Sequence, residues 1–386
     1  MKKREFLKTL GKGSLAILST NTILQACANQ ASSEAAKTSV IDASLNSKNW
    51  TWVTPQLGLS TDDWKKKLSM VKSSGIDAIL LEVYNGNHTF YDNDRFPVEE
   101  KLLEKLVPIC KELDMEFHAW MWTMPCNNEK IVKEHPDWYA VNGLGQSAAT
   151  HPAYVDYYKF LCPCNPEAQE FVRKNVESLA QIDDIDGVHL DYVRLPDVIL
   201  AEALQPKYDI VQDREYPQYD YCYSEYCRNQ FKEQTGIDPL KDLKDPSANE
   251  EWRQFRYDAI TNLVTKKLAP EARKYNKMIT AAVFPNWQMV RQQWGNWNLD
   301  AYLPMLYHNF YNEDIDWIKE HTIKGIARMQ TKKPLYSGLY IPSLTPKELQ
   351  EAYKVALEGG AGGISIFSMD QVSDAHWKAL SEVTKS

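Results

Sequence analysis

The sequence has no hydrophobic run long enough to cross a bilayer as a helix. Its longest weakly apolar stretch, residues 14–24, is interrupted by polar residues, whereas a membrane-spanning helix needs about 20 apolar residues. The chain also lacks a strong excess of charge: its 386 residues carry a formal net charge of −8, with no basic run beyond the N-terminus. This balance argues against a nucleic-acid partner.

Several catalytic and cofactor motifs are missing as well. The segment Thr54-Pro55-Gln56-Leu57-Gly58, after the first predicted strand, is no dinucleotide fingerprint. The eight histidines include neither His-x-His nor His-Glu-x-x-His, which leaves a metal-dependent hydrolase of those types without support. No Gly-x-Ser-x-Gly elbow occurs, which disfavours a serine esterase. We therefore expect neither a cofactor nor a metal.

Cysteine is sparse, with seven residues in the chain. Six cysteines remain when Cys27 is set aside. In an oxidising compartment these six could form one or two disulfides. Cys162-Pro163-Cys164 with Cys222 and Cys227 could also form a four-sulfur zinc site. The spacings of one residue and then four fit common zinc motifs badly, so we expect buried thiols or loop disulfides instead.

The chain begins with a predicted targeting segment, residues 1–27. Met1-Lys2-Lys3-Arg4 is similar to the start of a twin-arginine export motif, with Lys3 in place of the first arginine. Leu24-Gln25-Ala26-Cys27 resembles a lipoprotein signal-peptidase site, which makes Cys27 the predicted lipidation site. An ordinary cleaved signal is the alternative. Residues 28–48, rich in Ala, Ser, Asn and Thr, predict a flexible tether. We expect an exported protein, lipid-anchored to a membrane of the cell envelope (periplasmic or outer membrane).

Residues 49–386 predict one domain of alternating strands and helices, which is typical of a parallel sheet. The predicted strands are 50–53, 76–84, 116–122, 185–191, 278–284, 301–307, 334–340 and 363–368. This series predicts an α/β fold of the (β/α)8 TIM-barrel type, with long insertions after the third and fourth strands. An open, doubly wound sheet is the alternative, because residues 285–300 show no clear helical period.

Chemistry in such barrels lies at the C-terminal ends of the strands. The fourth strand ends in Asp191-Tyr192-Val193-Arg194. Asp191 is a candidate for a catalytic role, and the alternative is a purely structural ion pair between Asp191 and Arg194. The other candidates at strand ends are Glu82, Tyr84, His118, Trp122, His189, Trp287, Tyr307 and Asp370. Carboxyl groups gathered with aromatic rings favour glycosidic-bond hydrolysis, which uses two carboxyl groups, and aromatic faces stack on sugar rings.

Strand alternation narrows the catalytic candidates. Asp191 and His189 share one face of the fourth strand, while Val188 and Leu190 share the other, which suits packing against helices. Glu82 shares a face with Ala78 and Leu80 and could point into the barrel mouth. Asp370 lies just past the eighth strand, so its direction is not readable. We choose Asp191 as the catalytic carboxylate, with Glu82 first and Asp370 second as its partner. The alternative is that one of the three pairs with Arg194 or caps a helix.

Four segments together resemble the glycosyl hydrolase-like 10 group of glycoside hydrolases. They are Glu116-Phe117-His118-Ala119-Trp120, Asn165-Pro166-Glu167, residues 186–196, and Tyr302-Leu303-Pro304-Met305-Leu306-Tyr307. The resemblance implies a (β/α)8 barrel that acts on carbohydrate, with an active-site carboxylate at Asp191. Members often carry a second Asp directly after that position, where this chain has Tyr192.

The sequence therefore predicts a glycoside hydrolase that cleaves a polysaccharide or oligosaccharide by carboxylate acid/base chemistry. The candidate catalytic residues are Asp191, Glu82 and Asp370. The candidate sugar-binding residues are Arg194, His118, His189, Trp122, Tyr84, Tyr307 and Trp287. The alternative is a non-catalytic, carbohydrate-binding lipoprotein on the same fold.

Overall fold

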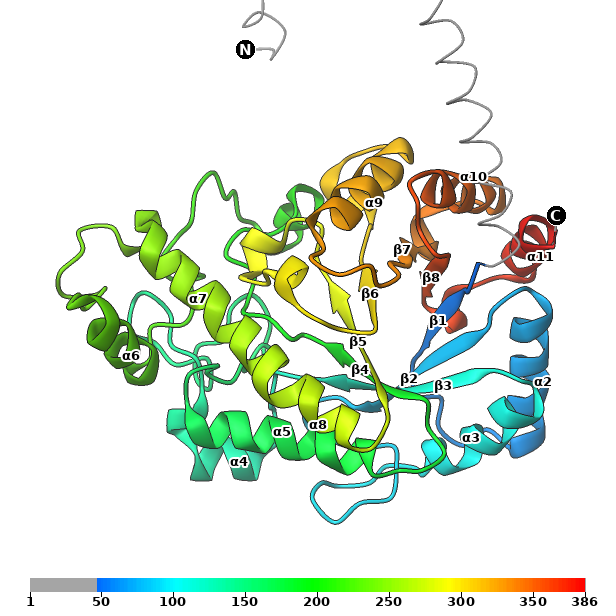
Figure 1. Ribbon diagram of the computed structural model, residues 1–386, viewed down its shortest axis with the longest axis horizontal. Helices are drawn as coiled ribbons and strands as arrows, with labels where there is room; N and C mark the ends of the chain where they lie inside the picture. Colours follow the sequence, from blue (N-terminus) through cyan, green and yellow to red (C-terminus); the bar gives the residue numbers. More distant parts are fainter. Residues whose placement is uncertain (1–46, 386) are drawn as a thin grey trace, which may run out of the picture. The chain divides into compact units, whose positions relative to one another are not determined.

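Parallel strands form a ring at the centre of the computed structural model, which describes residues 47–385 (Figure 1). The strands are β1 (Trp50–Val53), β2 (Ala78–Tyr84), β3 (Glu116–Trp122), β4 (Gly187–Asp191), β5 (Met278–Val283), β6 (Ala301–Pro304), β7 (Ser337–Tyr340) and β8 (Ile364–Phe367). Their order is β6-β5-β4-β3-β2-β1-β8-β7. Isolated parallel bridges, Tyr302 to Leu335 and Met305 to Gly338, join β6 to the segment of β7. The predicted (β/α)8 barrel is confirmed, and the open sheet is excluded.

Helices surround the ring (Figure 1). They are α2 (Thr61–Ser73), α3 (Leu102–Glu112), α4 (Glu129–Glu134), α5 (Pro166–Ala180), α6 (Glu225–Thr235), α7 (Glu250–Leu263), α8 (Ala269–Lys274), α9 (Asp316–Arg328), α10 (Pro346–Glu358) and α11 (Asp374–Thr384). Asn165 caps α5 as predicted, since its side chain accepts from the amides of Glu167 and Ala168. None of the helices in residues 47–385 is long and apolar enough to span a membrane.

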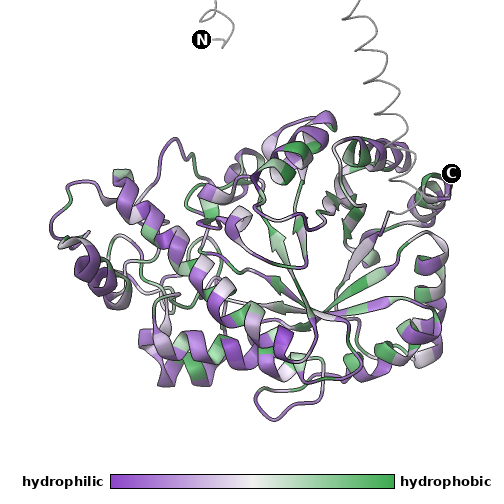
Figure 2. Cartoon of the chain, viewed as in Figure 1, coloured by the Kyte–Doolittle hydropathy of each residue, from purple (hydrophilic) through white to green (hydrophobic). Residues whose placement is uncertain are grey.

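The strands alternate between two buried layers. Val188 and Leu190 of β4 belong to the large core between the strands and the helices. Ala78 and Leu80 of β2 belong to a smaller cluster inside the ring, with Trp50, Trp52 and Trp120. Apolar residues accordingly concentrate on the strands and on the inner faces of the helices (Figure 2). The predicted direction of Glu82 and Asp191, into the barrel, follows from this alternation.

A β-bulge near the end of β2 breaks the alternation. Glu82 pairs with the inward-facing Trp120, but Tyr84 pairs with Met121, which faces outward. The extra residue turns Tyr84 into the outer core, where its ring packs on Phe96 at a centroid distance of 4.7 Å. The predicted sugar contact of Tyr84 is therefore wrong, because it assumed an unbroken period of two.

Two irregular segments set the shape of the barrel mouth. Residues 123–165 follow β3 and residues 192–224 follow β4, in agreement with the predicted insertions. The connection from β5 to β6 contains only the short 3₁₀ turns η5 (Trp287–Val290) and η6 (Trp294–Asn296). These segments place loop residues, rather than a regular helix, beside the C-terminal ends of β3, β4 and β5.

The N-terminal predictions lie mostly outside the described residues. Cys27, the signal and residues 28–46 of the predicted tether belong to this part of the chain. The last two tether residues contact the barrel instead: Ser47 Oγ lies 2.9 Å from Tyr353 Oη, and the Lys48 amide donates to Gly362 O at 2.9 Å. The folded part of the chain therefore includes Ser47 and Lys48.

Candidate active site

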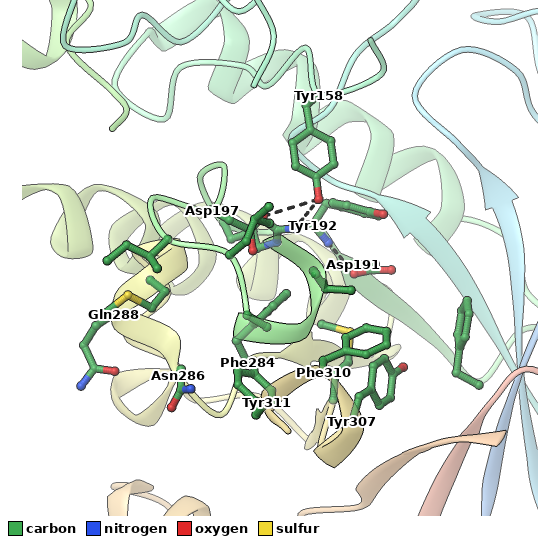
Figure 3. Close-up of a pocket in the computed structure, with 18 of the residues that line it drawn as sticks. Tyr158, Asp191, Tyr192, Asp197, Phe284, Asn286, Gln288, Tyr307, Phe310 and Tyr311 are labelled. Carbon is green, nitrogen blue, oxygen red and sulfur yellow. Dashed lines mark hydrogen bonds and ion pairs between the residues drawn. The ribbon is translucent and has the colours of Figure 1, made fainter. Parts of the chain in front are cut away.

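A cavity of about 1000 Å³ opens at the C-terminal ends of the strands. Strands β1, β2, β3, β4 and β8 contribute Trp52, Glu82, Trp120, Trp122, Asp191 and Phe367 to its lining. Loop residues complete the wall, and Figure 3 shows Asp191 and Tyr192 facing Tyr307 and Phe310 across the opening. The cavity lies where (β/α)8 enzymes keep their chemistry.

Asp191, the last residue of β4, is half-buried, and its carboxyl group has two donors. Its Oδ2 accepts from Trp120 Nε1 at 3.1 Å, and its Oδ1 accepts from the Tyr192 amide at 2.7 Å. Tyr192 adopts a left-handed backbone conformation, with φ at 51°, and this sharp turn ends the strand. Burial raises the pKa of Asp191 to about 6, although the two donors and the charge of Arg194 oppose the rise.

Glu82, which is buried, supplies a second carboxyl group from β2. Its Oε2 accepts one hydrogen bond, from Trp122 Nε1 at 3.1 Å. Burial raises the pKa of Glu82 to about 7, the Trp122 donor opposes the rise, and the charge of Asp191 adds to it. Glu82 and Asp191 are therefore close enough to influence each other's protonation.

Strand β3 runs between the two carboxyl groups and holds both through crossed indoles. In the strand ladder Trp120 pairs with Glu82, yet it donates to Asp191. Trp122 pairs with Asp191, yet it donates to Glu82. Each indole therefore reaches across to the carboxyl group of the other neighbouring strand. The arrangement can hold one carboxyl group ionised and the other protonated, which is the state that acid/base chemistry requires.

Aromatic rings line the rest of the cavity. The Trp122 ring lies 4.8 Å from that of Tyr192, and Tyr307 packs on Phe310 at 5.5 Å. Burial and the nearby charge of Asp191 raise the pKa of the Tyr307 hydroxyl, which stays protonated and can donate. Trp122 and Tyr307 are thus two predicted sugar-binding residues that line the cavity.

Arg194 also lines the cavity, but its guanidinium is engaged with its own loop. Its Nη1 donates to Leu195 O and to Asp197 Oδ2, both at 2.9 Å, and its Nη2 donates to Tyr158 Oη at 3.2 Å. The ion-pair partner of Arg194 is therefore Asp197 rather than Asp191. Arg194 holds the β4 insertion against Tyr158 of the β3 insertion, and a free guanidinium for sugar binding is not present.

The two predicted histidines lie inside the barrel beneath the cavity. His118 is fully buried, with Nε2 3.0 Å from Glu116 Oε2. His189 Nε2 accepts from Trp52 Nε1 at 3.2 Å, so its Nδ1 carries the proton and donates to Thr280 Oγ1 at 2.8 Å. Burial lowers the pKa of both imidazoles. Neither histidine lines the cavity, so their predicted contact with sugar is wrong: alternation gives the direction of a side chain, not its depth.

Two further candidates lie beside the cavity rather than in it. Asp370 is exposed, and its Oδ1 accepts from Thr54 Oγ1 at 2.9 Å and from Ser368 Oγ at 2.7 Å. The Trp287 ring packs edge-on against Tyr257 at 5.0 Å, while its neighbours Asn286 and Gln288 line the cavity. The short turns after β8 and β5 direct Asp370 and Trp287 away from the lining, which the sequence did not show.

Some lining residues were not among the predicted site residues. Trp120 lies two residues before Trp122 on β3, and the sequence already placed it with His118 and Trp122 at the end of that strand. Tyr158, Tyr257 and Arg253 come from the β3 insertion and from α7. No local pattern marks these last three, because their position depends on how the irregular segments fold over the mouth.

The fold and the cavity define the class of this protein as a (β/α)8 barrel with two carboxyl groups at its mouth. The family model described as Glycosyl hydrolase-like 10 matches residues 46–335. The chain belongs to that family, as its sequence motifs predicted.

Similar proteins agree with this assignment. "Glycosyl hydrolase YngK" of Bacillus subtilis (strain 168) is 24% identical over 291 residues, which cover 70% of this chain and 49% of the relative. The chain thus spans about half the length of that relative. Among solved structures, the glycoside hydrolase domain of PgaB (BpsB) from Bordetella bronchiseptica has a TM-score of 0.67 and 13% identity, covering 87% of this chain and 98% of that one. The catalytic domain of β-amylase from Paenibacillus polymyxa has a TM-score of 0.60 and 11% identity, covering 86% and 94%. These structures share the fold.

Proposed function

We propose that the protein hydrolyses glycosidic bonds of an oligosaccharide or polysaccharide, with Glu82 as general acid and Asp191 as nucleophile or general base. The observation that carries this proposal is the pair of carboxyl groups on β2 and β4, held by crossed indoles in one cavity. Hydrolysis of a glycosidic bond needs one carboxyl group protonated and one ionised.

The hydrogen bonds favour this assignment of roles. Asp191 accepts from two donors and lies near the charge of Arg194, whereas Glu82 accepts from one donor. Donors and positive charge stabilise a carboxylate, so Asp191 ionises first. Burial, together with the negative charge of Asp191, then holds the proton on Glu82. Glu82 can give that proton to the leaving oxygen, while Asp191 attacks the anomeric carbon or activates water.

The cavity supports a substrate larger than one sugar. Ligand pockets usually measure about 300–1000 Å³, and this cavity lies at the upper end of that range. Its aromatic wall offers flat apolar faces for the C–H faces of pyranose rings. The signal and lipidation site predicted from residues 1–27 further suggest a glycan outside the cytoplasm, reached from a lipid anchor at Cys27.

The test compares wild type, Asp191→Asn and Asp370→Asn on a panel of oligosaccharides and polysaccharides, with product release followed by chromatography. Asp191→Asn should lower kcat by about 10²–10⁴-fold, the usual contribution of such a group. Asp370→Asn should stay near the wild-type rate, because its carboxyl group lies outside the cavity. Full activity of Asp191→Asn would overturn the proposal. Glycan binding without product release by wild type would favour the binding-only alternative.

A further inference from the structure

Four buried cysteines meet where the two insertions touch, and none of them lines the cavity. Cys162 and Cys164 come from the β3 insertion, and Cys222 and Cys227 come from the segment that follows β4. The Sγ atoms of Cys162, Cys222 and Cys227 lie within 4.8 Å of one another. Cys164 Sγ lies 2.8 Å from Cys227 Sγ. None of the cysteines in residues 47–385 forms a disulfide.

The sulfur positions suit a tetrahedral metal. A Zn–S bond of about 2.3 Å places two sulfurs of a tetrahedron about 3.8 Å apart. The Sγ atoms of Cys162 and Cys227 are 3.7 Å apart, which is close to that edge. The 2.8 Å between Cys164 Sγ and Cys227 Sγ is shorter than that edge, so Cys164 would have to shift on metal binding to become the fourth ligand.

The surroundings of the cluster favour thiolates. The Cys164 amide donates to Cys162 Sγ at 3.3 Å, and the Ser224 amide donates to Cys222 Sγ at 3.5 Å. Cys164 directly precedes the N-cap of α5, and Cys227 lies in the first turn of α6. The positive ends of two helices therefore lie next to the sulfurs, which stabilises negative charge.

We propose that Cys162, Cys164, Cys222 and Cys227 bind one Zn²⁺ in a structural, four-sulfur site. Each thiol loses its proton to solvent as the metal binds, and four protein ligands leave no open position for catalysis. The metal would join the β3 insertion to the β4 insertion, both of which contribute to the cavity wall. From the sequence this site was disfavoured, because the spacings of its cysteines fit common zinc motifs badly. Folding, however, brings together two pairs of cysteines that are far apart in the chain, and motif spacing does not describe such a pairing.

The first experiment measures the metal content of the full chain, purified from zinc-supplemented cells without added reductant or chelator. Plasma mass spectrometry should find about one zinc per chain, and Cys227→Ala or Cys162→Ala should lower the content by about tenfold or more. Cys110→Ala and Cys126→Ala are matched controls, since both residues are buried free cysteines outside the cluster. Both controls should keep the zinc of wild type.

A second measurement uses wild type alone, in case the cluster variants do not fold. Exchange of the bound metal for Co²⁺ should give the sulfur-to-metal charge-transfer absorption of a tetrahedral thiolate site. Wild type that contains no zinc and takes up neither Zn²⁺ nor Co²⁺ would overturn the proposal. Non-reducing peptide maps that show these four cysteines in disulfides, or iron bound in place of zinc, would overturn it as well.

Discussion

Glu82 and Asp191 differ in how many groups stabilise their charge. Glu82 is buried and Asp191 is half-buried, and loss of hydration raises both pKa values, to about 7 and about 6. Asp191 has the Tyr192 amide as an additional donor. One pKa unit corresponds to about 1.4 kcal/mol between the protonation states, so a single extra hydrogen bond is enough to set the order of ionisation.

This order predicts a narrow, bell-shaped pH dependence of kcat/KM. Activity should fall below about pH 6, where Asp191 is protonated, and above about pH 7, where Glu82 loses its proton. Glu82→Gln should remove the upper limb and slow ordinary glycans by about 10²–10⁴-fold. An aryl glycoside whose leaving group needs no proton should be slowed much less. Rates measured from pH 4 to 9 on both kinds of substrate check this prediction, and an unchanged upper limb in Glu82→Gln would contradict it.

At the scale of elements, a buried charge network fixes the β4 insertion to the barrel. Asp220 Oδ1 accepts from Arg256 of α7 and, at 2.9 Å, from Arg291 in the β5–β6 connection. Its Oδ2 accepts from Tyr223 Oη at 2.6 Å. All three charged side chains are buried, and the two guanidinium groups hold the pKa of Asp220 below its usual value despite burial. One carboxylate thus connects three segments that border the cavity.

Asp220→Asn should therefore be strongly destabilising. The substitution leaves two buried guanidinium groups without this counter-ion, and breaking a buried pair lowers the free energy of unfolding by about 3–5 kcal/mol. Glu358→Gln is the control: it removes the pair between Glu358 and Lys319, which joins α9 to α10 at the surface. An exposed pair contributes about 0–1 kcal/mol. Urea unfolding curves give both values, and equal effects of the two variants would contradict the prediction.

At the scale of the whole molecule, the carboxyl pair links activity to stability. A folded barrel holds two carboxyl groups whose pKa values are raised from 3.8 and 4.5 to about 6 and about 7. Between about pH 4 and pH 7 the folded state therefore binds more protons than the unfolded state. Under that condition the free energy of unfolding falls as the pH rises. The stabilising contribution is complete below about pH 4 and is lost as the pH passes about 7.

Asp191→Asn and Glu82→Gln should each remove the part of this pH-dependent loss of stability that comes from the substituted carboxyl group. Each neutral amide resembles the protonated carboxyl group, so the stability difference between variant and wild type should change little below about pH 4. Between pH 4 and pH 8 each variant should gain up to about 3 kcal/mol relative to wild type, from a shift of somewhat over two pKa units. Denaturant unfolding at both pH values measures this gain. Variants that lose stability relative to wild type as the pH rises would show that the buried carboxylates are better compensated than the geometry indicates.

The sequence by itself determined the barrel, the strand order and the direction of the main carboxyl groups. Buried strands follow a period of two, and helices follow capping residues such as Asn165; these patterns are local. Glu82 and Asp191 could therefore be assigned to the inner face, and the family could be identified from short motifs. The same local information could not give depth, which is why His118 and His189, on the inner face as well, lie below the cavity.

Tertiary structure alone decided which residues meet. The bulge that turns Tyr84 outward arises from the pairing of β2 with β3. The pairing of Arg194 with Asp197, and the approach of Cys162 to Cys227 across 65 positions of the chain, depend on the path of irregular insertions. Such segments carry no periodic pattern, because their positions are set by contacts with distant residues rather than by their own backbone preferences. The wall of the cavity and the proposed zinc site are thus consequences of packing.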